Sequence, residues 1–443
     1  MRDGVLATTA GPVMALTLIG VLLGSCGKSD LPQEAGYGPD PQLPAPSTEW
    51  IPTLKAPKAV GWGEGEMPTP ASGFTLTRFA EGLEHPRWLY ELPNGDILVA
   101  ESDAPKKPPG ASGGIRAWVQ GFVMQRAGSR TDSADRITLL RDADGDGVAE
   151  TRSVFLSGLF SPFGMALVGN QLYIANANAL VRFDYQEGAT QIAGPATKVA
   201  DLPAGRNHHW TKSLVASPDG SKLYVGVGSN SNVAENGMDE EKDRAAVLEI
   251  DAASGQTRNF ASGLRNPVGI DFNPANGALW VAVNERDEIG PDLVPDYMTS
   301  VQDGGFYGWP YSYFGQNVDE RVEPQNPELV AKAIKPDYAL GAHSASLGFT
   351  FVDDERMGSE FAGGAIIGQH GSWNRNPPAG YRVIFVPFVN GAPEGMPQEL
   401  LTGFFNADTG EAKGRPVGVI VDRSGGLLVA DDVGNVVWRL RKG

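Results

Sequence analysis

One pattern of apolar and polar positions recurs along most of the chain. In each copy a proline or small-residue entry leads into a short apolar segment, which is followed by a turn and a second segment of the type Leu-aromatic-Val-Ala. No long amphipathic helical pattern separates the copies, which argues against alternating strands and helices. The six copies begin at His85, Ser161, His209, Asn266, Ser346 and Arg415.

The repeat predicts an all-β fold, a six-bladed β-propeller with long inter-blade loops. Turns at 93–95, 218–220 and 424–426 are typical of hairpins within such blades. A blade cannot bury both faces alone, so it packs on its neighbours, and ring closure leaves few free edges. An irregular pair of β-sandwiches is the alternative interpretation. In a propeller, the loops that lead into the innermost strands gather on one face, so we expect the chemistry where the copies begin.

The N-terminus follows a different pattern. Residues 11–23 form an apolar run after Arg2, and the only cysteine, Cys26, follows in the sequence Leu-Gly-Ser-Cys. The run is too short to span a bilayer and fits a signal sequence. With its cysteine it resembles a bacterial lipoprotein signal over 1–25, cleaved before an acylated Cys26. An ordinary signal peptide with a chance cysteine is the alternative. Acylation would anchor the protein at the periplasmic side of the cell envelope, and Gly27 favours the outer membrane.

Composition divides the rest of the chain and excludes several classes. Residues 26–72 are rich in proline, so we expect an extended tether that buries little, followed by a folded body over 73–443. A formal charge of −17 argues against nucleic acid as a partner, because an acidic surface repels phosphates. A single cysteine leaves no intrachain disulfide and no multi-thiolate metal site.

Histidines and carboxylates supply the candidate chemistry. All five histidines fall on predicted channel loops, at His85, His208, His209, His343 and His370. The segment 142–147, Asp-Ala-Asp-Gly-Asp-Gly, mimics the start of an EF-hand loop. The twelfth position is a serine, however, where that loop needs a glutamate. A hairpin turn with exposed carboxylates is therefore favoured over a second calcium site.

Two further segments are more specific than a generic propeller. They are Gly-Leu-Arg-Asn-Pro-Val-Gly over 263–269 and Gly-Gly-Phe-Tyr-Gly-Trp-Pro over 304–310. Together with the His-His-Trp sequence at 208–210 and the Gly-Arg pair at Arg415, they resemble the glucose/sorbosone dehydrogenase family. Members are soluble quinoproteins that use pyrroloquinoline quinone (PQQ) and calcium on a six-bladed propeller. The resemblance covers most of 73–443 and is closer to the sorbosone-type branch.

The resemblance implies a cationic pocket for PQQ, which carries three carboxylates. Arg265, Arg375 and Arg415 lie on predicted channel loops, and the planar guanidinium fork suits carboxylates. A surface ion pair is the alternative role for each arginine. Asn266 would support the cofactor. The family's cofactor-binding lysine is missing, and a segment that contains His370 stands in its place.

The resemblance also assigns the catalytic base and the metal. His209 would remove the proton of the sugar C1 hydroxyl as hydride passes to the quinone, and His208 is the rival base. The carbonyls of Asp287 and Glu288 would bind Ca²⁺, which prefers oxygen ligands. A solvated acidic loop is the alternative reading of this segment.

The implied activity is PQQ- and calcium-dependent oxidation of an aldose or a related sugar aldehyde, sorbosone-like or glucose-like. Electrons would pass to a quinone or cytochrome acceptor. Two alternatives stay open. A calcium-dependent propeller lactonase would need carboxylates that converge on the channel. A non-catalytic binding module could keep the same scaffold, because fold does not fix function.

Overall fold

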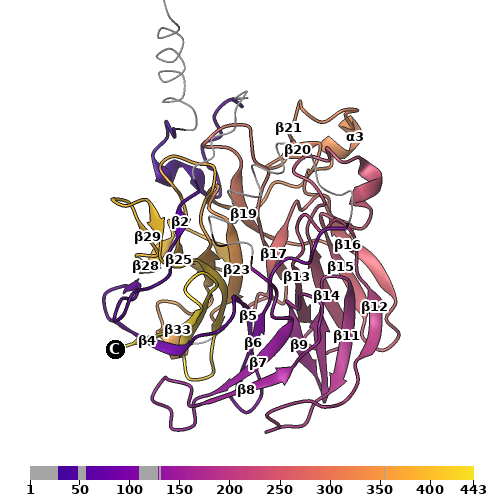
Figure 1. The fold of residues 1–443 in the computed structure, drawn as a ribbon. Coiled ribbons are helices and arrows are strands. Elements are labelled where there is room, and N and C mark those ends of the chain that lie inside the picture. The colour runs from indigo at the N-terminus through magenta and orange to yellow at the C-terminus, as the bar shows by residue number, and fades with distance from the viewer. Residues whose placement is uncertain (1–27, 48–55, 109–127, 129–130, 354) are drawn as a thin grey trace, which may run out of the picture.

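The computed structural model describes residues 28–47, 56–108, 128, 131–353 and 355–443 (Figure 1). Cys26 and the signal over 1–25 lie outside this part of the chain. Within it nearly every regular element is a strand, which confirms the predicted all-β class. The helices are short: η1 (Gln33–Gly36), η2 (Met238–Glu241), α3 (Pro327–Val330) and η3 (Glu355–Met357).

None of the helices in the described ranges has the length and apolar composition needed to cross a membrane.

Three antiparallel sheets of four consecutive strands come first. The first contains β5 (Pro86–Glu91), β6 (Ile97–Glu101), β7 (Arg136–Arg141) and β8 (Thr151–Leu156). The second contains β9 (Met165–Val168), β10 (Gln171–Ala175), β11 (Ala179–Asp184) and β12 (Thr197–Asp201). The third contains β13 (Lys212–Ala216), β14 (Lys222–Val227), β15 (Ala246–Asp251) and β16 (Thr257–Ser262).

Three more sheets follow, and each recruits a strand from the N-terminal part of the chain. The fourth contains β17 (Pro267–Phe272), β18 (Leu279–Val283), β19 (Pro295–Ser300), β22 (Tyr338–Ala342) and β1 (Tyr37–Gly38). The fifth contains β23 (Ser346–Phe351), β24 (Ala365–Gln369), β25 (Arg382–Val386), β28 (Gln398–Thr402) and β3 (Thr69–Pro70). The sixth contains β31 (Pro416–Val421), β32 (Leu427–Asp431), β33 (Val436–Lys442) and β4 (Phe74–Glu81).

Small ribbons complete the set of strands. They are β2 (Lys58–Ala59), β29 (Phe405–Asn406) and β30 (Glu411–Ala412) in one sheet, and the pairs β20 (Ser312–Tyr313) with β21 (Asn317–Val318), and β26 (Phe388–Val389) with β27 (Ala392–Pro393).

The first strands of the six larger sheets pack against one another in sequence order. β5 contacts β9, β9 contacts β13, and the series continues through β17, β23 and β31 back to β5. Glycines in four of the six copies, Gly164, Gly269, Gly348 and Gly418, allow this close approach. At Gly348 in β23 a Cβ atom would lie 2.1 Å from the carbonyl oxygen of Val417 in β31, so a larger residue would push the neighbouring sheet away.

The sixth sheet joins the two ends of the folded body. β4, from the start of the body, pairs antiparallel with β33, the last strand, in the register Val437↔Ala80 and Leu440↔Leu76. This pairing protects both edges, and it ties the N-terminal strand to the C-terminus of the chain.

The described part of the predicted tether is not free of the body, which corrects that expectation. Tyr37 is only 6% exposed, and its short strand β1 pairs with the outer strand β22. β3 pairs with β28, and the Trp62 ring packs edge-on against Trp438 at 5.5 Å. A proline-rich segment has few residues for a core of its own. It can still cover sheet edges by short backbone pairing and a few aromatic side chains.

Candidate functional site

Antiparallel pairing gathers the candidate residues at one end of the sheets. First strands start at this end, and second strands finish at it. His85, His209, Arg265 and Arg415 precede β5, β13, β17 and β31 by one to three positions. Ser229, Asn284, His370 and Asp432 follow β14, β18, β24 and β32 by one or two.

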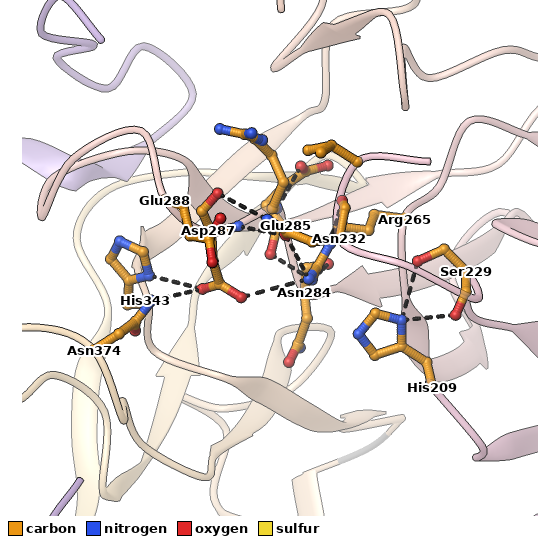
Figure 2. Close-up of polar contacts among 12 residues, drawn as sticks. His209, Ser229, Asn232, Arg265, Asn284, Glu285, Asp287, Glu288, His343 and Asn374 are labelled. Carbon is orange, nitrogen blue, oxygen red and sulfur yellow. Dashed lines mark hydrogen bonds and ion pairs between the residues drawn. The ribbon is translucent and has the colours of Figure 1, made fainter. Parts of the chain in front are cut away.

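His209 is held in one tautomer by Ser229. Its Nδ1 lies 2.9 Å from the Ser229 carbonyl oxygen and 3.0 Å from the Ser229 hydroxyl (Figure 2). A carbonyl oxygen only accepts, so Nδ1 carries the proton and Nε2 keeps its lone pair. Nε2 has no partner among the described residues, and it faces away from Ser229 in Figure 2. The ring is therefore arranged to accept a proton.

The surroundings keep both neighbouring histidines neutral. Burial, with the Arg265 guanidinium and His208 beside it, holds the pKa of His209 well below its usual value. Burial and Arg265 also lower the pKa of His208, to about 4. The two rings meet edge-on with their centres 4.7 Å apart. Of these two histidines, only the His209 ring is held in one tautomer by a hydrogen bond within the described residues, because the hydrogen bond of His208 to Asn230 comes from its backbone N–H.

Gly228 allows His209 and Asn266 to lie side by side. A Cβ at this position would come within 2.2 Å of Asn266 Oδ1 and 2.5 Å of His209 Cβ. Asn266 Oδ1 is buried and has no hydrogen-bond partner in the described part of the chain. Such an unsatisfied acceptor costs free energy unless a water or a bound group donates to it. The predicted supporting role of Asn266 is consistent with this unpaired atom.

Arg265 is 3% exposed, and all five of its N–H groups have acceptors. Nη1 donates to the carbonyl oxygens of Asn284 at 3.3 Å and Glu285 at 2.6 Å. Nε and Nη2 donate to the carbonyl and the side-chain oxygen of Asn232, at 3.3 and 3.0 Å. Nη2 also lies 3.4 Å from Asp287 Oδ2. Arg265 thus fixes the 284–287 loop beside His209, and it would bind a cofactor directly only by exchanging one of these partners.

Asn232 links these groups, and sequence reasoning missed it. Its Oδ1 accepts from the backbone N–H of Asp287 at 2.9 Å as well as from Arg265, and its Nδ2 donates to the Asp287 carbonyl at 3.1 Å. The Asn232 carbonyl accepts from the indole N–H of Trp309 at 3.0 Å, and the backbone N–H of Trp309 donates to the Gly263 carbonyl. The two specific segments, 263–269 and 304–310, therefore meet here. No local sequence signal marks Asn232, because its partners come from other loops.

Asp287 forms the other side of the site (Figure 2). Its Oδ1 accepts from Asn374 at 2.9 Å and lies 3.2 Å from His343 Nδ1. Burial opposes ionisation, but His343, Arg265 and Asn374 outweigh it and hold the pKa of Asp287 at about 2. The same ion pair raises the pKa of His343 against the effect of burial. The carboxylate is therefore ionised at neutral pH.

The carbonyls predicted to bind Ca²⁺ already accept side-chain donors. The Asp287 carbonyl accepts from Asn232, and the Glu288 carbonyl accepts from Arg321 Nη1 at 3.1 Å. Glu288 has a φ of +76°, an unusual conformation for a residue with a side chain. A carbonyl oxygen has two lone pairs, so a single side-chain donor does not by itself prevent either carbonyl from binding an ion.

Arg415 and His370 belong to a second group on the same end. Arg415 Nη2 donates to the Tyr381 hydroxyl at 2.8 Å, and its Nη1 lies 3.4 Å from His370 Nδ1. His370 Nε2 lies 2.9 Å from Asp432 Oδ2, which also pairs with Arg87. Burial lowers the pKa of His370 to about 4.

Several buried polar atoms of this second group have no hydrogen-bond partner among the described residues. They are His85 Nε2, Arg87 Nε, Arg415 Nε and Asp432 Oδ1. Unpaired guanidinium donors in a buried cluster are what an anionic ligand would use. Sequence reasoning did not select Arg87 or Asp432, because an arginine inside a strand and an aspartate after one are common in any β-protein.

Arg375 joins neither group. Its Nη2 donates to Ser29 at 2.7 Å and Asp292 at 2.9 Å, and its Nε donates to the Pro291 carbonyl at 2.9 Å. It fastens the N-terminal segment to the body. Asn374, the residue before it, is the one that reaches Asp287.

The acidic loop over 142–150 lies at the opposite end, in the turn between β7 and β8. Ligand atoms of Asp142, Asp144, Asp146 and Glu150 lie within 4.8 Å of one another, and all but Asp142 are exposed. Asp142 pairs with Arg439 at 2.7 Å. The predicted hairpin turn is present, because β7 and β8 pair antiparallel across this loop.

The fold and this end of the sheets define a class of proteins built from a ring of small sheets, with buried histidines and arginines where the first strands begin. Residues 135–302 and 314–443 match the TrAA12-like family, and the chain belongs to this family.

Two curated proteins are similar to this chain in sequence. An uncharacterised protein of Borreliella burgdorferi is 28% identical over 293 residues, which cover 64% of this chain and 76% of that protein. A pyrroloquinoline quinone-dependent pyranose dehydrogenase of Coprinopsis cinerea is 25% identical over 339 residues, 62% of this chain. The match spans 45% of that enzyme, so the chain covers less than half of its length.

Solved structures share the fold. The PQQ domain of the Coprinopsis cinerea pyranose dehydrogenase superposes with a TM-score of 0.68 at 20% identity, over 85% of this chain and 97% of that one. The calcium structure of a Trichoderma reesei family AA12 enzyme gives 0.68 at 19%, over 90% and 100%. The soluble aldose sugar dehydrogenase of Escherichia coli gives 0.56 at 16%, over 84% and 100%.

Proposed function

We propose that this protein is a quinoprotein oxidoreductase that oxidises an aldose or a related sugar aldehyde, sorbosone-like or glucose-like, with PQQ and Ca²⁺. Electrons pass from it to a quinone or cytochrome acceptor. The observation that carries the proposal is His209, neutral and fixed by Ser229, with no partner for Nε2 in the described part of the chain, next to the Arg265–Asp287 network. The family match and the PQQ-dependent pyranose dehydrogenase among its relatives support the same activity.

The six larger sheets act in this proposal as six blades of one propeller. Their first strands contact one another in order, and the last returns to the first. The candidate residues come from the third, fourth, fifth and sixth sheets, with Arg87 from the first. A flat ligand at the centre of the ring would be within reach of loops from several blades.

When bound, PQQ would accept the hydride, which carries the two electrons of the oxidation. The chain's own residues supply the rest. His209 Nε2 accepts the proton of the substrate hydroxyl, and the Ser229 carbonyl stabilises the resulting imidazolium through Nδ1–H. Arg87, Arg415 and His370 are the groups that would hold carboxylates of the cofactor, and Asn266 Oδ1 would accept a hydrogen bond from it. Ca²⁺ would bind at the Asp287 and Glu288 carbonyls.

The test is reconstitution. Purified protein is mixed with PQQ and CaCl₂, and a redox dye reports oxidation of a panel of aldoses. We expect dye reduction that requires PQQ, that falls on calcium chelation and that is lost in His209→Gln. Absence of PQQ binding at micromolar concentration would overturn the proposal.

We also propose that the protein is a lipoprotein, acylated at Cys26 and held at the periplasmic side of the envelope, in the outer membrane. The lone cysteine at the end of the short apolar run supports this. Mass spectrometry of the N-terminal peptide should show a diacylglyceryl group on Cys26, and Cys26→Ser should release the protein from the membrane fraction.

The lactonase alternative gains no support from the described residues. A calcium lactonase needs several carboxylates at the channel, and the acidic group able to hold a metal lies at 142–150, at the other end. Hydrolysis of a lactone panel without PQQ would reverse this preference.

A further inference from the structure

The first described residues of the chain are fastened to the end of the molecule that carries the candidate site. Ser29 Oγ donates to Asp292 Oδ1 at 2.6 Å and accepts from Arg375 Nη2 at 2.7 Å. The Ser29 N–H donates to the Asn376 carbonyl at 2.9 Å, and the Asp30 N–H donates to Asp292 Oδ2 at 3.0 Å. This set of contacts, here named the Ser29 latch, includes the ion pair between buried Arg375 and half-buried Asp292.

A second attachment follows within ten residues. Tyr37 pairs through its backbone with Leu340 in β22, and its hydroxyl accepts from Arg382 at 2.7 Å. The Arg382 guanidinium also lies over the Tyr37 ring at 5.6 Å. The buried Tyr37 side chain therefore fixes the C-terminal end of the segment 29–37, and the Ser29 latch fixes its N-terminal end.

The latch lies directly beside the site. Arg375 follows Asn374, whose Nδ2 donates to Asp287 at 2.9 Å. Asp292 belongs to the same loop as Asp287 and Glu288, between β18 and β19. The point where the N-terminal segment meets the body is therefore part of the rim around His209 and Asp287.

We propose that the Ser29 latch orients the molecule on the bilayer, with the site end of the sheets against the membrane surface. This rests on the lipid at Cys26 in the proposed function. Three residues lead from Cys26 to Ser29, a path of at most about 11 Å. A free tether over 26–72 would instead let the body move roughly 40 Å from its lipid anchor and take any orientation relative to the bilayer. The partner surface is thus the lipid layer that holds the anchor.

The distances of the two ends of the sheets from the membrane can be compared with a thiol-reactive label, because Cys26 is the only cysteine and would be acylated. Val318 in β21 is 47% exposed, and Val148 in the turn between β7 and β8 is 41% exposed. Figure 1 shows β21 at the end where the indigo N-terminal segment lies, and the β7–β8 turn at the opposite end. Val318→Cys and Val148→Cys, each labelled with a thiol-reactive fluorophore, therefore form a matched pair on acylated Cys26.

The readout is energy transfer to rhodamine lipids in phosphatidylethanolamine–phosphatidylglycerol vesicles that carry the lipidated protein. We expect at least threefold more efficient transfer from Val318→Cys than from Val148→Cys. Inserting twelve Gly and Ser residues after Gly27 leaves the fold untouched and should bring the two values together, as should Asp292→Ala with Tyr37→Ala.

Equal transfer at the two positions of the unmodified chain would overturn the proposal, as would a difference that persists with the long insert. An unlipidated N-terminal peptide would overturn it too. PQQ-dependent dye reduction by the Cys26→Ser protein, measured in solution, tests the proposed activity separately, so the two failures are distinguishable.

Discussion

Replacement of Asn232 by alanine should disable the site without touching the proposed base or cofactor ligands. The change removes one hydrogen bond from a charged donor, Arg265 Nη2 at 3.0 Å, and two to the backbone of Asp287 at 2.9 and 3.1 Å. The first contributes about 1.5–3 kcal/mol, and each neutral one about 0.5–1.5 kcal/mol. Asn232 is only half-buried, so water replaces part of the loss.

We therefore expect a net loss of about 2 kcal/mol in transition-state stabilisation, which corresponds to roughly a thirtyfold fall in kcat/KM. The assay is PQQ-dependent dye reduction with saturating PQQ. The matched control is Asn236→Ala, which removes a single hydrogen bond, to the Asn230 carbonyl at 3.1 Å, from the same loop. We expect less than a threefold effect there.

The isosteric Asn232→Asp separates positioning from bulk stability. It keeps an acceptor for Arg265 and loses the donor to the Asp287 carbonyl. Its added negative charge opposes the effect of Arg265 on His209, so the acid limb of the kcat/KM profile should move to higher pH. Asn232→Ala with activity within threefold of Asn236→Ala, or Asn232→Asp with an unmoved profile, would refute the reasoning.

Three other predictions follow from the same geometry. In wild-type protein the acid limb of kcat/KM should lie well below pH 6.5, because the neutral imidazole is the base and burial with Arg265 lowers the pKa of His209; a limb at or above pH 6.5 would contradict this. His209→Gln should lower kcat by about 10²–10⁴ while PQQ binding, followed by absorbance, is retained. Gly348→Ala places a Cβ 2.1 Å from the Val417 carbonyl oxygen and should lower stability by roughly 1–3 kcal/mol, seen as a lower Tm, whereas Gly194→Ala, with no atom within 4 Å, should leave Tm unchanged.

Local sequence predicted much of this molecule because its signals are short-range. Strand, turn and strand recur along the chain, and in four of the six copies a glycine marks where neighbouring first strands meet, as at Gly348. The position of His209 and Arg265 just before first strands was enough to place both at one end of the sheets. The position of Asp287 just after a second strand placed it there too.

The tether and Arg375 show where this reasoning fails. Proline content predicted that 26–72 would bury little, yet Tyr37 and Trp62 cover sheet edges hundreds of residues away. Arg375 has the same type of local sequence as the other arginines, but its partners, Ser29 and Asp292, come from distant loops. Which cation meets which anion depends on loop paths that no local pattern encodes.

The sequence by itself therefore determined the strands, their order and the end at which the candidate residues gather, because these depend on alternation and spacing along the chain. Only the tertiary structure decided which side chains touch: Ser229 on His209, Asn232 between Arg265 and Asp287, and Ser29 on Arg375. These contacts join residues between 20 and 346 positions apart, and hydrogen bonds act over about 3 Å, so they exist only once the strands have paired and the sheets have packed together.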